Sequence, residues 1–350
     1  MKKGYIVLEN GQIFEGTRFG YEGEAIGEIV FNTSAVGYIE TLTDACYKGQ
    51  ILLQTFPLIG NYGWISADTN GKEIAPAAYI VREWCEKPSN FRCEGTIDSE
   101  LKTRKIPGIY GVDTRALTKI IRENGTMNAI ICDDPSAVDF ALLKAYKPEF
   151  TLCSCGNKVY KAQNEKHKVT VICYGETYGA VNSLLSRDCS VTVLPASATA
   201  DEVLATNPDG IFLGSGSGNP EDYKECIETV KSLVGKKPIF AVSLGHQILA
   251  LAKGAKTYKL KYGHRGASQP VKEVATGRTH ITSQNHGYCV DTDSVTALSG
   301  VVTYINGNDK TCEGVEYASD KAFSVQFIPE KAFGEDNTEN VLFNKFVSML

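Results

Sequence analysis

The chain has 350 residues, 43% of them hydrophobic and 22% charged, which is typical of a folded, water-soluble protein with two domains. Its formal net charge of -5 gives no reason to expect a nucleic acid or an anionic membrane as a partner. No apolar run is long enough to cross a membrane, and the two lysines at the start precede no apolar stretch of the kind that secretory signals need.

The cysteines indicate a reducing compartment. Eleven of them are scattered along the chain, and an odd number in a long chain favours free thiols over a disulfide framework. Cys153 and Cys155 form the one close pair, and a single pair of this kind falls short of the four ligands of a structural zinc site. We therefore expect a cytoplasmic protein without a metal ion.

The first part of the chain is predicted to be rich in β-strands. Residues 5–8 and 12–14 flank an Asn-Gly turn and should form a hairpin, and further strand-like runs occupy residues 28–34 and 50–56. One helix is predicted after Asp113, a suitable N-cap.

The predicted helix carries an apolar stripe of Leu117, Ile120 and Ile121, and Gly125 can terminate it. We interpret the stripe as core packing. The pattern then weakens over a polar stretch, residues 148–168, which we predict to be a linker between domains at residues 1–147 and 169–350.

Strands and helices alternate after the predicted linker. Strand-like runs at residues 169–175, 191–196, 209–214 and 238–243 are separated by helical patterns, which predicts βαβ units around a mainly parallel sheet. Beyond Gly263 we expect shorter strands and a final helix near residues 340–350. The fold class is therefore α/β, with a β-rich domain first.

Two strand ends have an unusual composition, and parallel sheets place their sites at such ends. The run GSGSGNP, residues 214–220, lacks the Lys-Ser/Thr ending of a phosphate loop and suggests backbone exposed to a small ligand. The run Ala241-Val242-Ser243-Leu244-Gly245 resembles a nucleophile elbow, in which small residues let a strand turn sharply into a helix. An ordinary strand-to-helix junction with a serine N-cap fits the same five residues.

The wider sequence resembles one family over nearly its whole length. The segments FNTSAVGYIETLTDACY, NPDGIFLGSGSGNP, FAVSLGHQILALA, GAKTYKLKYGHRG, ITSQNHGY and AFSVQFIPE occur in this order. Together they resemble the small subunit of carbamoyl-phosphate synthase, in which a β-rich domain precedes a class I glutamine amidotransferase domain.

The resemblance implies a function and a partner. Members of this family hydrolyse glutamine with a Cys-His-Glu triad and pass the ammonia to a large subunit. That subunit combines the ammonia with bicarbonate, using ATP and Mg, to make carbamoyl phosphate for arginine and pyrimidine synthesis. No cofactor is expected in the small subunit itself.

The resemblance also assigns roles to individual positions. The family nucleophile falls on Ser243, its general base on Ile328 and its orienting carboxylate on Glu330. The family's contacts to glutamine fall on Cys46, Gly216, Gly218, Leu244, Gln247, Asn285, Gly287 and Tyr288.

Two members of the triad depart from the family pattern. Serine replaces cysteine at position 243, and isoleucine replaces histidine at position 328, before Pro329 and Glu330. A serine hydroxyl needs an adjacent base to remove its proton, and isoleucine cannot accept one. Loss of triad members typically lowers turnover by about 10⁴ to 10⁶.

No other histidine is expected to replace the missing base. The sequence has five, and His246 lies on the predicted helix three residues after Ser243. However, helical side chains lean along their own face, whereas an elbow nucleophile points out of the turn. The remaining four are His167 in the predicted linker, His264, His280 and His286.

Three functions therefore stay open. The chain is a small subunit with lost or strongly impaired glutaminase activity, a working glutaminase with an unrecognised base, or a glutamine-binding sensor no longer tied to the synthase. A serine esterase is a more distant alternative, because it lacks the same base.

Overall fold

The computed structural model describes residues 2–69, 71–148, 156–175, 177–329 and 337–350, in two compact units, Met1–Phe150 and Thr151–Leu350. Domain boundaries at residues 147 and 169 stay a prediction. The stretch predicted as a linker is not connecting chain throughout, because β10 (Lys158–Tyr160) pairs with a strand of the second unit.

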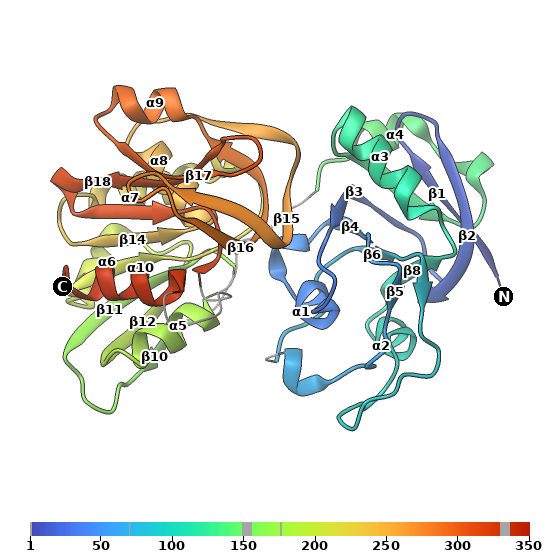
Figure 1. Ribbon diagram of the computed structural model, residues 1–350, viewed down its shortest axis with the longest axis horizontal. Coiled ribbons are helices and arrows are strands. Elements are labelled where there is room, and N and C mark those ends of the chain that lie inside the picture. The colour runs from blue at the N-terminus through green and yellow to red at the C-terminus, as the bar shows by residue number, and fades with distance from the viewer. Residues whose placement is uncertain (1, 70, 149–155, 176, 330–336) are drawn as a thin grey trace. The chain divides into compact units, whose positions relative to one another are not determined.

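The first unit is built on a β-barrel (Figure 1), closed in the order β1-β2-β8-β6-β4-β3-β9. The predicted hairpin is confirmed as β1 and β2, which pair antiparallel around a turn with Gly11 at a φ of 87°. The strands are β1 (Lys3–Leu8), β2 (Ile13–Gly20), β3 (Ala25–Asn32), β4 (Gln50–Gln54), β5 (Leu58–Ile59), β6 (Ala78–Ile80), β7 (Glu83–Trp84), β8 (Pro107–Tyr110) and β9 (Met127–Cys132). The helices are α1 (Tyr38–Leu42), α2 (Ile97–Thr103), α3 (Thr114–Asn124) and α4 (Phe140–Ala145).

Helix α3 follows the prediction closely. The Asp113 carboxylate accepts a hydrogen bond from the Ala116 N–H at 3.0 Å, and Gly125 caps the other end. Leu117 and Ile121 are fully buried. Two residues of the predicted stripe therefore belong to the core as expected, and the third, Ile120, is half-buried.

The second unit is a mixed sheet with helices on both faces. Its strands are β10 (Lys158–Tyr160), β11 (His167–Cys173), β12 (Cys189–Pro195), β13 (Gly210–Leu213), β14 (Ile239–Val242), β15 (Thr257–Glu273), β16 (Thr279–Val290), β17 (Val301–Asn306), β18 (Cys312–Tyr317) and β19 (Ala322–Val325). Its helices are α5 (Tyr178–Leu185), α6 (Ala200–Ala205), α7 (Lys224–Leu233), α8 (Leu244–Ala252), α9 (Thr292–Ala297) and α10 (Thr338–Val347).

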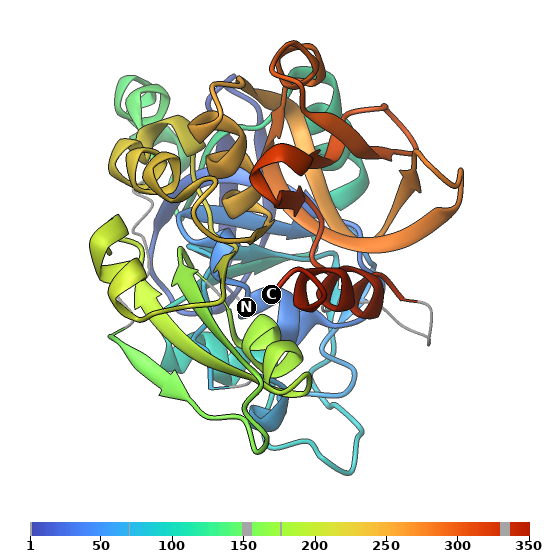
Figure 2. The same cartoon turned by 90° about the vertical axis from the view of Figure 1, so that its left-hand side faces the viewer.

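The centre of this sheet is parallel, as the alternating pattern predicts. The strand order is β10-β12-β11-β13-β14-β19-β18-β17-β15-β16, and neighbours from β12 to β19 run parallel. Alternate residues of the central strands enter different cores: Ala241 packs with α6, α7 and α8, and Phe240 packs with α5 and α10. Helix α10, in red, lies beside α5 in Figures 1 and 2.

The expectation of shorter strands beyond Gly263 is wrong. Strand β15 has 17 residues and β16 has 12, and they pair antiparallel as one long ribbon with irregularities after Lys259 and Gly266. Polar residues interrupt the alternation that marks a strand, because several of them are buried against each other. The final helix is confirmed as α10.

The described part of the chain contains no helix with both the length and the apolar composition that crossing a membrane demands. No disulfide links the described cysteines, which are Cys46, Cys85, Cys93, Cys132, Cys173, Cys189, Cys226, Cys289 and Cys312. The Cys153 and Cys155 pair lies outside the described residues.

The cap of α3 gives a test of the first unit. Asp113→Ala removes the acceptor of the Ala116 N–H and should lower the free energy of unfolding by about 1 kcal/mol. Asp113→Asn keeps an acceptor and should change it little. Urea unfolding of both variants measures this, and equal losses would show that the cap contributes nothing.

Candidate active site

Ser243 lies on a sharp, strained turn between β14 and α8. Its φ of 57° and ψ of -113° fall in a region that residues with a side chain rarely adopt. The residue is 3% exposed. A strained residue between a buried strand and a helix is the geometry of a nucleophile elbow, so this interpretation is favoured over an ordinary serine N-cap, and the Ser243 side chain makes no capping hydrogen bond.

Backbone contacts with the neighbouring strands hold the turn. The Ser243 N–H donates to the Val325 carbonyl of β19 at 2.9 Å, and the Gly245 N–H donates to the Gly214 carbonyl at 3.1 Å. A Cβ atom at Gly245 would lie 2.6 Å from the Leu213 carbonyl oxygen. Helix α8 therefore begins as close to β13 as a glycine allows.

The glycine-rich loop after β13 lies against the same turn. A Cβ atom at Gly216 would lie 2.7 Å from the Leu244 side chain, so this glycine brings the loop backbone next to the residue after Ser243. Gly218 has a φ of 100°, which glycine adopts without strain. The Ser217 carbonyl accepts a hydrogen bond from the Tyr223 hydroxyl at 2.6 Å, which fixes the loop.

The next predicted contacts come from α8 and β16. The Gln247 amide on α8 donates to the Tyr288 carbonyl at 2.9 Å and to the Gln326 side chain at 2.8 Å. Asn285 and Gly287 lie on the same strand as Tyr288. The structure therefore brings Gln247 and Tyr288 into contact, and Gly216 and Leu244 as well.

Two of the three triad positions follow the ends of adjacent strands. Val242 of β14 pairs with Val325 of β19, so Ser243 and Ile328 both follow the carboxyl ends of neighbouring parallel strands. Ile328 is half-buried, and its N–H donates to the Ser283 carbonyl at 2.9 Å. Glu330 lies outside the described residues.

Cys46 belongs to the first unit, so its predicted contact with glutamine stays a prediction. It is 5% exposed, and its N–H donates to the Asp44 carboxylate at 2.9 Å. This short turn fixes the backbone at Cys46.

His246 is engaged away from Ser243. Its Nδ1 atom is hydrogen-bonded to the Ser324 hydroxyl at 2.8 Å, and the ring is fully buried. Burial lowers its pKa to about 3, because a charged imidazolium loses its hydration there. Its Nε2 atom has no hydrogen-bond partner among the described residues. His246 is therefore a neutral structural residue.

Sequence reasoning missed a buried polar network beside the candidate site. His264 Nε2 lies 2.8 Å from an Asp309 oxygen, and His264 Nδ1 lies 3.3 Å from a Glu313 oxygen. His286 Nδ1 lies 2.8 Å from the Tyr288 carbonyl, which also accepts from Gln247. No local sequence pattern marks Glu313 as buried, because its neighbours on β18 are buried on both faces of the strand.

Neighbouring charges set the pKa values in this network. Burial works against a charge on His264, but hydrogen bonds to Asp309 and Glu313 outweigh it and raise its pKa to about 9. Burial opposes ionisation of Asp309 too, yet the bond to His264 keeps its pKa below the usual range. Burial raises the pKa of Glu313 and lowers that of His286 well below its ordinary value.

Relatives of known function share the whole length of the chain. The family described as "Glutamine amidotransferase class-I" matches residues 170–349, and "Carbamoyl-phosphate synthase small chain, CPSase domain" matches residues 6–131. The chain is 45% identical over 348 residues to the carbamoyl phosphate synthase small chain of Clostridium perfringens, covering 99% of each. The small chain of Fusobacterium nucleatum is 44% identical over 346 residues, 98% of this chain and 96% of the relative.

The strain at Ser243 gives a stability test. Ser243→Gly should raise the free energy of unfolding by about 1 kcal/mol, because relief of the positive φ exceeds the entropy cost of a glycine. Ser217→Gly is the matched control, because Ser217 has no positive φ, and it should destabilise. Urea unfolding of both variants gives the comparison, and a Ser243→Gly variant less stable than wild type would contradict it.

His246 gives a pH test. Its pKa is about 3 in the folded protein against 6.5 ordinarily, so the unfolded chain binds a proton that the folded chain does not. The stability that comes from keeping His246 neutral is fully present above about pH 6.5. Below this pH, the free energy of unfolding falls by up to about 1.4 kcal/mol per pH unit as the pH drops toward 3. His246→Gln should show a shallower decline in denaturant titrations from pH 7 to 4. Parallel pH profiles would refute the assignment.

Proposed function

Because this chain belongs to the carbamoyl-phosphate synthase small chain family and is its glutamine amidotransferase subunit, we propose that it binds glutamine and docks on a large subunit while its own hydrolysis of glutamine is lost or strongly impaired. The observation that carries this proposal is the pair of residues, Ser243 and Ile328, that follow the ends of β14 and β19. An alcohol occupies the strained turn at Ser243, and a hydrocarbon side chain occupies position 328.

The chemistry at this pair argues against efficient hydrolysis. A thiol is partly ionised at neutral pH and intrinsically nucleophilic, whereas an alcohol attacks an amide only when a base takes its proton. Ile328 offers no lone pair, and Glu330 has no imidazole at position 328 to orient. The turn thus keeps the backbone geometry of a nucleophile elbow but lacks the proton acceptor that an alcohol nucleophile needs.

The histidines of the chain support this reading, because each is engaged elsewhere. His246 is bonded to Ser324, and His264 and His286 belong to the buried network. His280 lies on β16 beside the Tyr304 ring, with centroids 6.4 Å apart. His167 begins β11, at the amino end of the strand, while Ser243 follows a carboxyl end.

The glutamine pocket itself is proposed to persist. In the second unit its proposed walls are the loop around Gly216 and Gly218, the turn at Leu244, and β16 with Asn285, Gly287 and Tyr288. Three of these positions are glycines, which can offer a ligand only their backbone groups. Binding without hydrolysis follows from this contrast.

A large subunit would then take its nitrogen from free ammonia, or be regulated through contact with this chain. ATP and Mg act in that subunit, and the carbamoyl phosphate serves arginine or pyrimidine synthesis. A second candidate is a glutamine sensor that no longer docks. Calorimetry with glutamine and co-purification with a large subunit separate the two, because only the first requires the complex.

Restoring the triad tests the proposed loss of hydrolysis. Ser243→Cys alone should leave glutamate release from glutamine near background, whereas Ser243→Cys with Ile328→His should raise it by about 10⁴ or more. The assay follows glutamate with the large subunit present. Ile328→His alone is the matched control and should stay low, because an alcohol is the weaker nucleophile.

Two outcomes would contradict this proposal. Wild-type turnover equal to that of a Cys-His-Glu relative would mean that Ser243 has an unrecognised base. Full recovery by Ser243→Cys alone would likewise place a working base near position 243. Calorimetry of each variant with glutamine shows that the pocket is intact, so a low rate cannot be mistaken for lost binding.

A further inference from the structure

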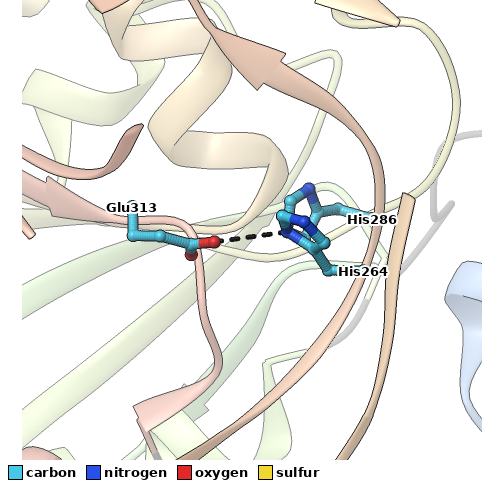
Figure 3. A group of neighbouring side chains, drawn as sticks. All are labelled: His264, His286 and Glu313. Atoms are coloured by element: carbon cyan, nitrogen blue, oxygen red, sulfur yellow. Dashed lines mark hydrogen bonds and ion pairs between the residues drawn. The ribbon is translucent and has the colours of Figure 1, made fainter. Parts of the chain in front are cut away.

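Two imidazoles and a carboxylate converge in the buried network of the second unit. His264 comes from β15, His286 from β16 and Glu313 from β18, so the three side chains tie the long ribbon to the rest of the sheet. Their ligand atoms all lie within 4.8 Å of one another (Figure 3), and the residues are 7%, 7% and 0% exposed. The cluster includes neither Ser243 nor Ile328.

An acceptor fixes the outer nitrogen of each ring. His264 Nε2 lies 2.8 Å from the Asp309 carboxylate, and His286 Nδ1 lies 2.8 Å from the Tyr288 carbonyl. Neither carboxylate nor carbonyl oxygen has a proton to give, so both nitrogens donate. In neutral rings the inner nitrogens, His264 Nδ1 and His286 Nε2, therefore carry lone pairs, and they lie 3.3 Å apart.

More acceptors surround these two lone pairs than donors. A Glu313 oxygen lies 3.3 Å from His264 Nδ1, and the Gln284 amide oxygen lies 3.1 Å from His286 Nε2. The amide N–H groups of Asn306 and Gln284 each donate to Glu313 at 3.1 Å, and the Asn306 nitrogen also lies 3.4 Å from His264 Nδ1, a long distance for a hydrogen bond. Four acceptor atoms thus converge in a buried space, where their mutual repulsion is relieved either by a proton on His264 or by a metal ion among them.

We propose that this cluster is a binding site for a divalent transition metal ion, with Zn²⁺ as the best fit, held by His264 Nδ1, His286 Nε2 and Glu313. Two atoms that each lie about 2.1 Å from a zinc ion at a tetrahedral angle are roughly 3.4 Å apart. His264 Nδ1 lies 3.3 Å both from His286 Nε2 and from a Glu313 oxygen. Two imidazoles favour zinc over Mg²⁺ or Ca²⁺, which prefer oxygen ligands throughout.

The surroundings match those of metal-bound histidines. Such rings almost always donate their other N–H to a carboxylate or a backbone carbonyl, and here Asp309 and the Tyr288 carbonyl take these places. The Asp309 and Glu313 carboxylates balance the two charges of the ion. The Gln284 amide oxygen lies where it can complete the coordination. The ion would join β15, β16 and β18 and fix the backbone at Tyr288.

Metal binding to the full chain tests the site. The purified chain, stripped with a chelator, is dialysed against Zn²⁺ and analysed for bound metal, and then titrated with Co²⁺ and followed by visible absorption. We expect one ion per chain, a tetrahedral cobalt spectrum without thiolate charge-transfer bands, and a higher melting temperature with Zn²⁺. Glu313→Gln should weaken binding at least about a hundredfold, because loss of a second-shell partner alone weakens it about 10–100-fold.

Two variants keep the test specific. Glu316→Gln on the same strand is the matched control and should bind like wild type, because Glu316 pairs with Lys345 outside the cluster. Asp309→Asn alters a partly exposed residue and should weaken binding about tenfold. Asp309→Asn replaces Glu313→Gln as the test variant if circular dichroism shows that Glu313→Gln does not fold.

Three results would overturn the site. Failure of the stripped chain to bind Zn²⁺ would mean that a proton serves as the shared cation. Thiolate bands in the cobalt spectrum would move the ion to cysteines. If Glu313→Gln binds Zn²⁺ as tightly as wild type, the metal is an adventitious ion only. If Glu313→Gln does not fold, the same conclusion follows from equal affinity of Asp309→Asn and wild type.

Discussion

The second unit depends on one residue held in a strained backbone conformation. Ser243 would cost about 1–3 kcal/mol at its positive φ if nothing compensated it. Compensation comes from β19, which accepts its N–H, and from the close approach of Gly245 to β13. The turn places the start of α8 beside β13. The glycine loop and β16 take their positions from this start of α8.

Much of the fold could be predicted from the sequence, because the signals are local. The Asn-Gly turn produces the first hairpin, and Asp113 and Gly125 delimit α3. Alternating strands and helices predict the parallel centre of the second sheet, and the small residues around Ser243 predict the turn. In each case the residues that form the structure are neighbours along the chain.

The remaining features depend on contacts between distant residues. The sequence of β15 and β16 is too polar to predict long strands. His264 and His286 face each other across the ribbon, and hydrogen-bond partners that come later in the sequence compensate for their burial. Glu313 is one of these partners, and no local pattern indicates that it is buried. The closeness of the strand ends that precede Ser243 and Ile328 likewise follows from the pairing of β14 with β19.

The turn and the buried network meet at one carbonyl group. Tyr288 accepts hydrogen bonds from Gln247, on the first turns of α8, and from His286 in the network. Gln247 also bonds Gln326, whose N–H donates to the Glu313 carbonyl. A cation bound as proposed at His286 and Glu313 would therefore also order the backbone of β16 where glutamine is proposed to bind. This support is independent of the nucleophile and its base, so a chain of this kind can lose hydrolysis and still keep a pocket shaped for the substrate.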